Sequence, residues 1–524
     1  MPTSDQPDNA SSSGSSKKVH LSKPSLDKDL SKIVSMEEAT RSLSQHLMAP
    51  GLAVLFLAVA GGFASVLIGA QPNAVFVVVA AILGGYMALN IGANDVANNV
   101  GPAVGSKALT MTGALIIAAV FESAGALIAG GDVVSTISKG IIDPSLVSDS
   151  QTFIWAMMSA LLASALWVNL ATCIGAPVST THAVVGGVMG AGIAAVGFGA
   201  VNWGTMSAIA ASWVISPLLG GVIAALFLAF IKNNIIYRDD KIAAARRWVP
   251  VLLAIMASAF SCYLLMKGLK QIWKPGIGYI ALISVAVFVL AYVILKPMIR
   301  KQSEGMENRN QSLRELFHLP LIFSAALLSF AHGANDVANA VGPLAAILHA
   351  AQSGDIAAKV ELPIWVMIIG AFGISLGLFL YGPKLIRMVG EKITKMNPMR
   401  AYCVALSAAI TVILASALGL PVSSTHIAVG AVFGVGFFRE YYTSKSNRRR
   451  QYVKKHSRAV LDGTSEDTDD EDDGKETVYD QEDVARRKLV RRSHFTTIIA
   501  AWVITVPAAA LLSACIFFVI TMIW

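Results

Sequence analysis

Two short polar motifs, each present twice, contain the residues best suited to chemistry in this chain of 524 residues. The first motif is GANDVAN, at residues 92–98 and again at residues 333–339. Amide and carboxylate oxygens are hard ligands that suit Na⁺, and a carboxylate can alternatively carry a proton. The motif therefore predicts a site for a cation or a proton, with buried helix caps as the alternative. Its candidate residues are Asn94, Asp95, Asn98, Asn335, Asp336 and Asn339.

The second motif is PVSTTH at residues 177–182, which returns as PVSSTH at residues 421–426. Proline is favoured in the first turn of a helix, and serine or threonine caps that turn. The free N–H groups of a helix start attract anions, and hydroxyl groups add hydrogen-bond donors. The motif therefore predicts an oxyanion site, with ordinary capping and Ser/Thr packing as the alternative. Its candidate residues are Ser179, Thr180, Thr181, Ser423, Ser424 and Thr425.

Three further polar residues are candidates for an accessory role. His182 and His426 end the second motif, and each could contact the anion, accept a proton or orient a neighbour. Of these roles we favour the ordering of a neighbour. Glu122 lies in the apolar sequence FESAG, where an acidic residue indicates either a place on an ion path or a structural polar contact.

The elements that position these motifs must lie in a membrane. Residues of the AVILMFWYC class make up 55% of the chain and charged residues only 14%, against about 25% charged in soluble domains. This composition excludes an ordinary soluble enzyme and a disordered chain. We expect an all-α polytopic membrane protein with about 10–13 hydrophobic segments. The apolar segments are approximately 50–70, 75–93, 109–130, 153–174, 178–199, 205–231, 248–267, 277–296, 317–335, 363–382, 401–419, 421–438 and 495–523.

The net charge of +8 follows the topology of these segments. If each segment crosses once from a cytoplasmic N-terminus, the loops 131–152 and 336–362 fall outside and carry one lysine each. This is the positive-inside pattern, to which Lys270 and Lys274 are an exception. The charge therefore indicates membrane orientation and no nucleic-acid partner. The loops that fall inside are 232–247, 297–316, 383–400 and 439–494.

Four parts follow from this organisation. Residues 1–49 form a polar tail without a signal-peptide pattern, which we expect to be cytoplasmic and disordered. The loop 439–494 holds an acidic run between two basic runs and predicts a cytoplasmic linker, with a regulatory or lipid-headgroup role as the alternative. The remaining parts are a first transmembrane half at 50–231, a central connection with a transmembrane pair at 232–316, and a second half at 317–524 that includes the loop.

The two motifs recur in the same order at offsets of 241 and 244 residues, which indicates a duplicated unit. On the crossing count, the segments that end in the two GANDVAN copies run in opposite directions. The sequence therefore predicts two inverted repeats, an arrangement that many secondary transporters use. Because Gly92 and Gly333 permit a break and Pro102 and Pro343 interrupt helices, we expect discontinuous helices whose ends point at a central site. The segments 178–199 and 421–438 could be re-entrant.

Charge repulsion at this site predicts coupling. A carboxylate at membrane depth costs about 2.5–3.5 kcal/mol unless it has a partner or faces a polar cavity. Neither motif contains Lys or Arg, and Asp95 and Asp336 would repel a divalent anion. Cations or protons that neutralise the two carboxylates would remove this repulsion. The affinity for the anion would then be high only with the co-ion present.

Both GANDVAN copies and both PVS(T/S)TH copies, in this order, resemble the signatures of the inorganic phosphate transporter (PiT) family over approximately residues 75–523. The resemblance implies symport of inorganic phosphate, free or as a metal–phosphate complex, with protons or sodium by alternating access. It implies a cation-coupling role for Asp95 and Asp336. Asn99 departs from the repeat, because the second copy has Ala340. Phosphate binding is implied for Asn94, Asn98, Asn335, Asn339, Ser179, Thr180, Thr181, Ser423, Ser424 and Thr425.

The remaining expectations concern function class and location. The chain has no G-x-x-x-x-G-K-[ST] loop and no paired His/Glu metal motif, so we expect neither an enzyme nor a cofactor or resident metal. We expect an integral protein of the bacterial inner (plasma) membrane, with phosphate, a proton or sodium, and the lipid bilayer as partners. A homo-oligomer stays open. Two other functions stay open: a symporter for another oxyanion such as sulfate, and a channel without coupling.

Overall fold

The computed structural model describes residues 47–71, 73–143, 146–147, 149–175, 178–268, 275–353, 362–388, 396–445 and 492–523. The chain divides after Leu52, and the fold below is that of the unit from Ala53 onward. The predictions for the tail 1–49 and the loop 439–494 fall mostly outside the described residues. Lys270 and Lys274 also lie outside them.

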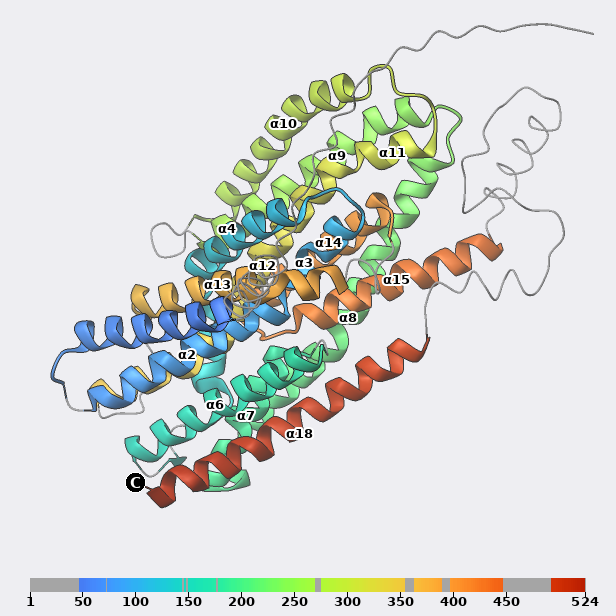
Figure 1. Cartoon of the computed structure of the whole chain (residues 1–524). Helices are drawn as coiled ribbons and strands as arrows, with labels where there is room; N and C mark the ends of the chain where they lie inside the picture. Colours follow the sequence, from blue (N-terminus) through green and yellow to red (C-terminus); the bar gives the residue numbers. More distant parts are fainter. Residues whose placement is uncertain are drawn as a thin grey trace, which may run out of the picture. The chain divides into compact units, whose positions relative to one another are not determined.

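Helices make up nearly all of the described chain (Figure 1), and an isolated β-bridge joins Ile142 to Val201. Eleven described helices are long and apolar enough to cross a membrane, and the prediction of an all-α polytopic membrane protein is confirmed. The first of the eleven is Leu47–Ile68. The other helices are α2 (Ala74–Asn94), α3 (Val96–Gly105), α4 (Met111–Ala129), α5 (Gly131–Ser135), α6 (Ser150–Ile174), α7 (Thr180–Val196), α8 (Trp203–Ile231), α9 (Lys241–Tyr263), α10 (Ile277–Gln302), α11 (Asn310–Leu316), α12 (His318–Ser353), α13 (Ile364–Met388), α14 (Pro398–Ala417), α15 (Ser424–Lys445) and α18 (Arg492–Ile523).

The start of several helices is set by a polar side chain that accepts a hydrogen bond from a backbone N–H of the first turn. Such a cap satisfies one of the donors that a helix leaves free at its start. The side chains that do this are Thr110 before α4, Asp149 before α6, Ser179 before α7, Asn202 before α8, Asp240 before α9 and Asn397 before α14. The two helices that begin in the second motif, α7 and α15, are not among the eleven candidate spans.

The glycines of GANDVAN join helices and do not break them. α12 continues through the second copy and through Pro343, and the first copy is interrupted only at Asp95, between α2 and α3. A Cβ atom on Gly92 would lie 1.9 Å from the backbone oxygen of Ile374, and one on Gly333 would lie 2.1 Å from that of Glu122. The expected helix break is therefore absent from the second copy. Tight packing of neighbouring helices accommodates a proline inside a membrane helix.

The two copies of the repeat exchange their packing partners. α7 of the first copy packs against α18, and α15 of the second copy packs against α8 (Figure 1). Glycines mediate both contacts: a Cβ on Gly190 would lie 2.1 Å from the oxygen of Ala510, and one on Gly434 would lie 2.1 Å from that of Gly221. α2 packs against α13 and α4 against α12 in the same reciprocal way. Each copy therefore depends on the other for its close packing.

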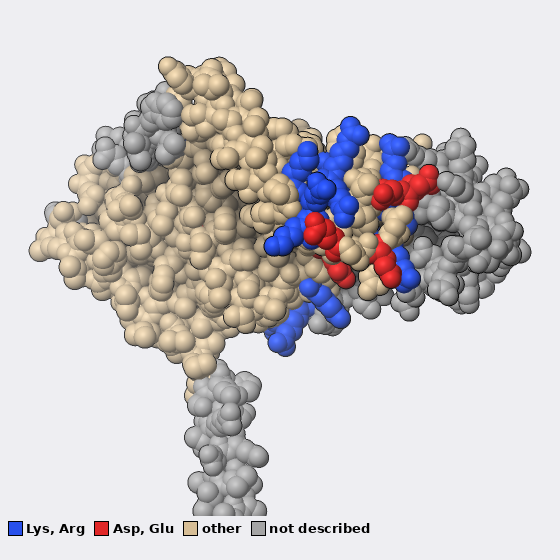
Figure 2. Space-filling model, turned by 90° about the horizontal axis from the view of Figure 1, so that it is seen from above, with Lys and Arg blue, Asp and Glu red and all other residues tan. Residues whose placement is uncertain are grey.

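Basic side chains gather toward one side of the described part of the molecule, with acidic side chains among them (Figure 2). Two of the loops that the crossing count places on one side contact each other. Arg246 Nε donates to Ser303 Oγ at 2.6 Å, and Asn308 Nδ2 donates to the backbone oxygen of Asp239 at 2.6 Å. The beginning of α9 and the end of α10 therefore lie together, as the predicted topology requires.

Candidate functional site

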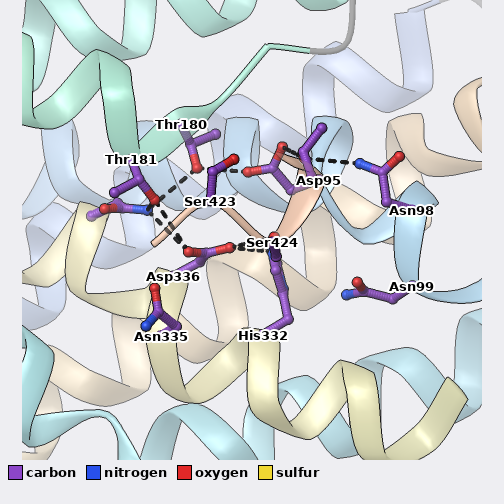
Figure 3. A network of polar contacts seen from close by, with 12 residues as sticks. Asp95, Asn98, Asn99, Thr180, Thr181, His332, Asn335, Asp336, Ser423 and Ser424 are labelled. Atoms are coloured by element: carbon purple, nitrogen blue, oxygen red, sulfur yellow. Dashed lines mark hydrogen bonds and ion pairs between the residues drawn. The ribbon is translucent and has the colours of Figure 1, made fainter. Parts of the chain in front are cut away.

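The four motif copies meet in one buried polar cluster (Figure 3). The two helix starts, at α7 and α15, contribute hydroxyl groups. The middle of α12 and the junction of α2 with α3 contribute carboxylates and amides. Every residue that either motif predicted as a ligand is buried, and none has more than 8% of its surface exposed. The fold thus assembles all twelve predicted residues into the same region.

Asp95 is held by hydroxyl groups from both copies of the repeat. Thr180 Oγ1, in the first copy, donates to Asp95 Oδ2 at 2.6 Å. Thr425 Oγ1, in the second copy, donates to Asp95 Oδ1 at 3.2 Å. Asn98 Nδ2 donates in turn to Thr425 Oγ1 at 2.9 Å. One carboxylate therefore links elements that are 330 residues apart in the sequence.

Asp336 has the reciprocal arrangement. Ser424 Oγ, in its own copy, donates to Asp336 Oδ2 at 3.0 Å, and Thr181 Oγ1, in the other copy, donates to Oδ1 at 3.4 Å. Asn339 Nδ2 donates to Thr181 Oγ1 at 3.1 Å, which repeats the bond between Asn98 and Thr425. The two carboxylates thus share one pattern, in which hydroxyl groups from both repeats surround each charge.

Asn94 and Asn335 each contact a hydroxyl group that lies outside the second motif. Asn94 Nδ2 donates to Thr172 Oγ1 at 2.9 Å, and Asn335 Nδ2 donates to Ser416 Oγ at 2.9 Å. Asn335 Oδ1 also accepts a hydrogen bond from the backbone N–H of Val422 at 3.3 Å. These amides hold the chain segment that leads into the second motif. Their geometry supports a positioning role.

Ser179 and Ser423 cap the two helix starts. Ser179 Oγ accepts a hydrogen bond from the backbone N–H of His182 at 3.1 Å, and Ser423 Oγ accepts one from that of His426 at 3.3 Å. These two serines therefore show the capping that the sequence left as an alternative, whereas the next two hydroxyl residues of each motif face the carboxylates.

The two motif histidines pack against each other. The ring centroids of His182 and His426 are 4.4 Å apart, and the His182 ring lies 3.7 Å from that of Trp213. His182 Nδ1 is 2.7 Å from Ser179 Oγ, and Trp213 Nε1 donates to the backbone oxygen of Pro421 at 3.2 Å. This cluster ties the two helix starts together and supports the ordering role expected of both histidines.

Sequence reasoning missed His332, which binds two acidic groups. Its Nδ1 is 2.6 Å from Glu122 Oε2 and its Nε2 is 2.6 Å from Asp336 Oδ2. Asn99 Nδ2 donates to the other oxygen of Glu122 at 2.8 Å. The available signal was the position of His332 one helical turn before Asp336, since residues four apart share a helix face. Glu122 thus has a defined polar partner, although its place on an ion path stays a prediction.

The contact between His332 and Glu122 has no counterpart at the equivalent positions of the first copy of the repeat. Ile91 stands in the first copy where His332 stands in the second. Gly92 contacts the backbone of Ile374 as Gly333 contacts that of Glu122, so Ile374 occupies the place equivalent to Glu122. Asp336 therefore has a basic neighbour on its own helix, whereas the equivalent neighbour of Asp95 is apolar.

The cluster has the donor set for a cation. Ligand atoms of Asp95, His332 and Asp336 all lie within 4.8 Å of one another, and all three residues are buried. Asn99 Oδ1 and Asn339 Oδ1 are also buried and accept no hydrogen bond from any residue that the structure describes. A buried carboxylate or amide oxygen without a donor is costly, and a small hard cation would satisfy it.

Comparison with known proteins places this geometry in a family. The model of the family described as "Phosphate transporter family" matches residues 91–513. A protein of Helicobacter pylori strain J99 with the words phosphate permease in its name is 47% identical, over 93% of this chain and 98% of its own length. One of Pyrococcus abyssi, with the same words in its name, is 34% identical over 83% and 96%. A solved structure titled "The sodium-dependent phosphate transporter" is 34% identical, covers 86% of this chain and all of its own, and gives a TM-score of 0.72. The chain belongs to the phosphate transporter family.

Proposed function

We propose that this chain imports inorganic phosphate by symport with a monovalent cation, sodium or a proton, through alternating access of two inverted repeats. Phosphate transport itself follows from membership of the family. Sodium is favoured as the co-ion because a similar solved structure is titled a sodium-dependent phosphate transporter. The observation that carries the proposal is the pair of buried carboxylates, each bound by hydroxyl groups of both repeats.

The hydroxyl groups explain how cation and anion would be coupled. In this structure Thr180, Ser424 and Thr425 donate their hydroxyl hydrogens to carboxylates. A cation bound by Asp95 and Asp336 would take over these acceptors and leave the hydroxyl donors for the oxygens of phosphate. Without the cation, phosphate would meet two carboxylates and few free donors. Each ligand therefore increases the affinity for the other, as thermodynamic linkage requires.

The predicted phosphate ligands fall into two groups on this proposal. Thr180, Thr181, Ser424 and Thr425, together with Asn98 and Asn339, would contact phosphate at the two helix starts, whose free N–H groups favour an anion. The remaining predicted ligands would position this group: Ser179 and Ser423 as caps, and Asn94 and Asn335 through their contacts before the motif.

Reciprocal packing supports inverted repeats and alternating access. Equivalent elements exchange partners, as α7 does with α18 and α15 with α8, and a twofold relation between the copies produces such an exchange. Ser123 Oγ and Ser375 Oγ lie 2.8 Å apart where α4 meets α13, at another reciprocal contact. The end that carries the basic loops would face the cytoplasm, in accordance with the positive-inside rule. The bacterial inner membrane stays our proposal for the location.

Uptake into proteoliposomes tests this function directly. The purified full chain should accumulate radiolabelled phosphate when an inward sodium gradient is imposed, and to a smaller extent or not at all under a proton gradient alone. A protein with the double substitution Asp95→Asn and Asp336→Asn serves as the inactive control. Accumulation driven by the proton gradient alone would replace sodium with the proton, and equilibration indifferent to both gradients would contradict symport.

Competition tests the identity of the anion. Arsenate has the shape and charge of phosphate and should compete well for uptake, whereas sulfate should compete poorly. Equal inhibition by sulfate and arsenate would favour a general oxyanion symporter over a phosphate transporter.

A further inference from the structure

α10 is the most exposed of the candidate membrane helices. Only two of its residues, Ser284 and Ile299, are buried, and its main packing partner is α9. Ser258 Oγ on α9 donates to the backbone oxygen of Ser284 on α10 at 2.8 Å. The two helices form a hairpin between the two halves of the repeat. In a membrane, an apolar helix that neighbouring helices leave exposed faces the lipid chains.

The length of the apolar part of α10 places its end at the membrane surface. Residues 277–295 contain no charged side chain, and at 1.5 Å per residue they span about 28 Å. This is close to the roughly 30 Å of hydrocarbon in a typical bilayer. The next residue is Lys296, and Arg300 and Lys301 follow within the same helix. These three cations therefore begin where the hydrocarbon ends.

Four basic side chains at this level form no ion pair with an acidic residue in the described part of the chain. Lys296, Arg300 and Lys301 are exposed, and so is Arg247 near the start of α9. None of the four forms an ion pair with a residue that the structure describes, although Glu304 follows closely on the chain. Arg246 holds this part of α9 beside the end of α10 through its bonds to Ser303. We call these four residues the basic end of the hairpin.

Aromatic rings hold two of these charges at the helix surface. Lys296 Nζ lies 5.4 Å from the centre of the Tyr292 ring, one turn earlier on α10. Arg247 Cζ lies 5.4 Å from the centre of the Trp248 ring. Tyrosine and tryptophan are typical of the membrane interface, and a ring that holds a cation reduces the entropy lost when an anion binds.

We propose that the basic end of the hairpin binds the phosphate group of an anionic phospholipid, whose acyl chains lie along the exposed face of α10. The charge of the four residues fits an anionic headgroup, and the apolar face that continues from Lys296 fits the chains. A free phosphate ion would gain only the charge interaction at this exposed position, so the apolar contact is what favours a lipid. This site lies outside the repeat motifs and is independent of the transport site.

Lipid titration followed by native mass spectrometry tests the proposal. The delipidated full chain should retain phosphatidylglycerol, and the variant with Lys296→Gln, Arg300→Gln and Lys301→Gln should retain about a hundredfold less, since three basic residues near an anionic surface together contribute about 3 kcal/mol. Lys384→Gln with Arg387→Gln, which removes two exposed charges from the end of α13, is the matched control and should bind like the unsubstituted chain.

Three outcomes would overturn the proposal. These are equal phosphatidylglycerol binding by the glutamine variant and the control, equal binding of phosphatidylcholine by the unsubstituted chain, and displacement of the lipid by excess inorganic phosphate. The last outcome would assign the basic end to a free anion. A variant with Lys296→Arg and Lys301→Arg keeps the charge and should retain the lipid, which separates loss of charge from loss of folding.

Discussion

Asp95 and Asp336 hold equivalent places in the two repeats but have different neighbours. Both accept hydrogen bonds from hydroxyl groups of each helix start. Only Asp336 lies against His332, which in turn contacts Glu122. The two carboxylates therefore have different electrostatic surroundings. Both repeats supply equivalent hydroxyl groups to the site of the proposed cation, but His332 and Glu122 lie on the side of Asp336 alone.

Neutralising either carboxylate should abolish coupled uptake. Asp95→Asn and Asp336→Asn each keep the size of the side chain but remove the charge that a cation requires. We expect phosphate accumulation in proteoliposomes to fall to background for both variants, with membrane insertion and thermal stability retained. Full accumulation by either variant would remove that residue from the coupling mechanism.

Serine and threonine of the second motif should differ in what they contribute. Thr181→Ala and Thr425→Ala remove hydroxyl groups that face the carboxylates, and both should raise the apparent KM for phosphate. Ser179→Ala and Ser423→Ala remove caps, and each should lower stability by about 1 kcal/mol. Uptake kinetics and thermal unfolding measured on all four variants check this division. A raised KM only in the serine variants would reverse the assignment.

At the level of elements, glycines set the distance between helices. α2 approaches α13 and α12 approaches α4 at positions where no Cβ atom fits. Small residues at helix contacts are typical of membrane proteins, because packing replaces the hydrophobic effect between helices. The same contacts bring α13 and α4 against the two GANDVAN segments, so the glycines determine the geometry of the candidate site.

Adding one methyl group at such a contact should prevent close packing. Gly333→Ala would place its Cβ atom 2.1 Å from the backbone oxygen of Glu122, and separation of the helices is the only way to relieve the overlap. We expect a large loss of folded protein in detergent, measured by size-exclusion chromatography and thermal unfolding. Gly62→Ala is the control, because nothing lies within 4 Å of its added Cβ. Equal stability of the two variants would contradict the close contact.

At the scale of the whole molecule, charge and reciprocal packing describe one topology. Basic residues gather toward one side of the described part of the molecule (Figure 2). The start of α9, which contains Arg246, contacts the end of α10 at Ser303. On the crossing count, the two GANDVAN segments run in opposite directions through the membrane. On the proposed function, inverted repeats with a shared buried site would provide the two equivalent packings that alternating access needs.

Cysteine labelling tests this orientation at the two ends of α10. In a background without Cys173, Cys262, Cys403 and Cys515, a membrane-impermeant thiol reagent should label Gly276→Cys from outside intact cells. It should label Glu304→Cys only after the cells are opened. Labelling of both positions from the same side would contradict a single crossing by α10.

Local properties of the sequence predicted much of the fold and the residues that meet in the candidate site. A membrane-spanning helix needs about 20 consecutive apolar residues, and such a stretch can be recognised from the local composition alone. Ser179 and Ser423 were predicted as helix starts, because a cap interacts only with its own first turn. Both copies of each motif can be recognised in the sequence. All twelve predicted ligands are buried, and the fold brings them into one region. A polar side chain in a membrane-spanning segment is stable mainly where other polar groups can bind it, so such side chains gather in the interior of the protein.

The sequence by itself determined the membrane class and the duplication and predicted the residues of the candidate site, since these depend on composition, spacing and local hydrogen bonding. Only the tertiary structure decided which residues meet. The contact between Asn98 and Thr425 joins positions 327 residues apart. The contact of His332 with Glu122 depends on the packing of α4 against α12, which the sequence does not show. Gly92 and Gly333 looked like helix breakers in isolation and proved to be helix contacts. Packing between distant helices selects these partners, and a local pattern contains no information about which distant helix will approach it.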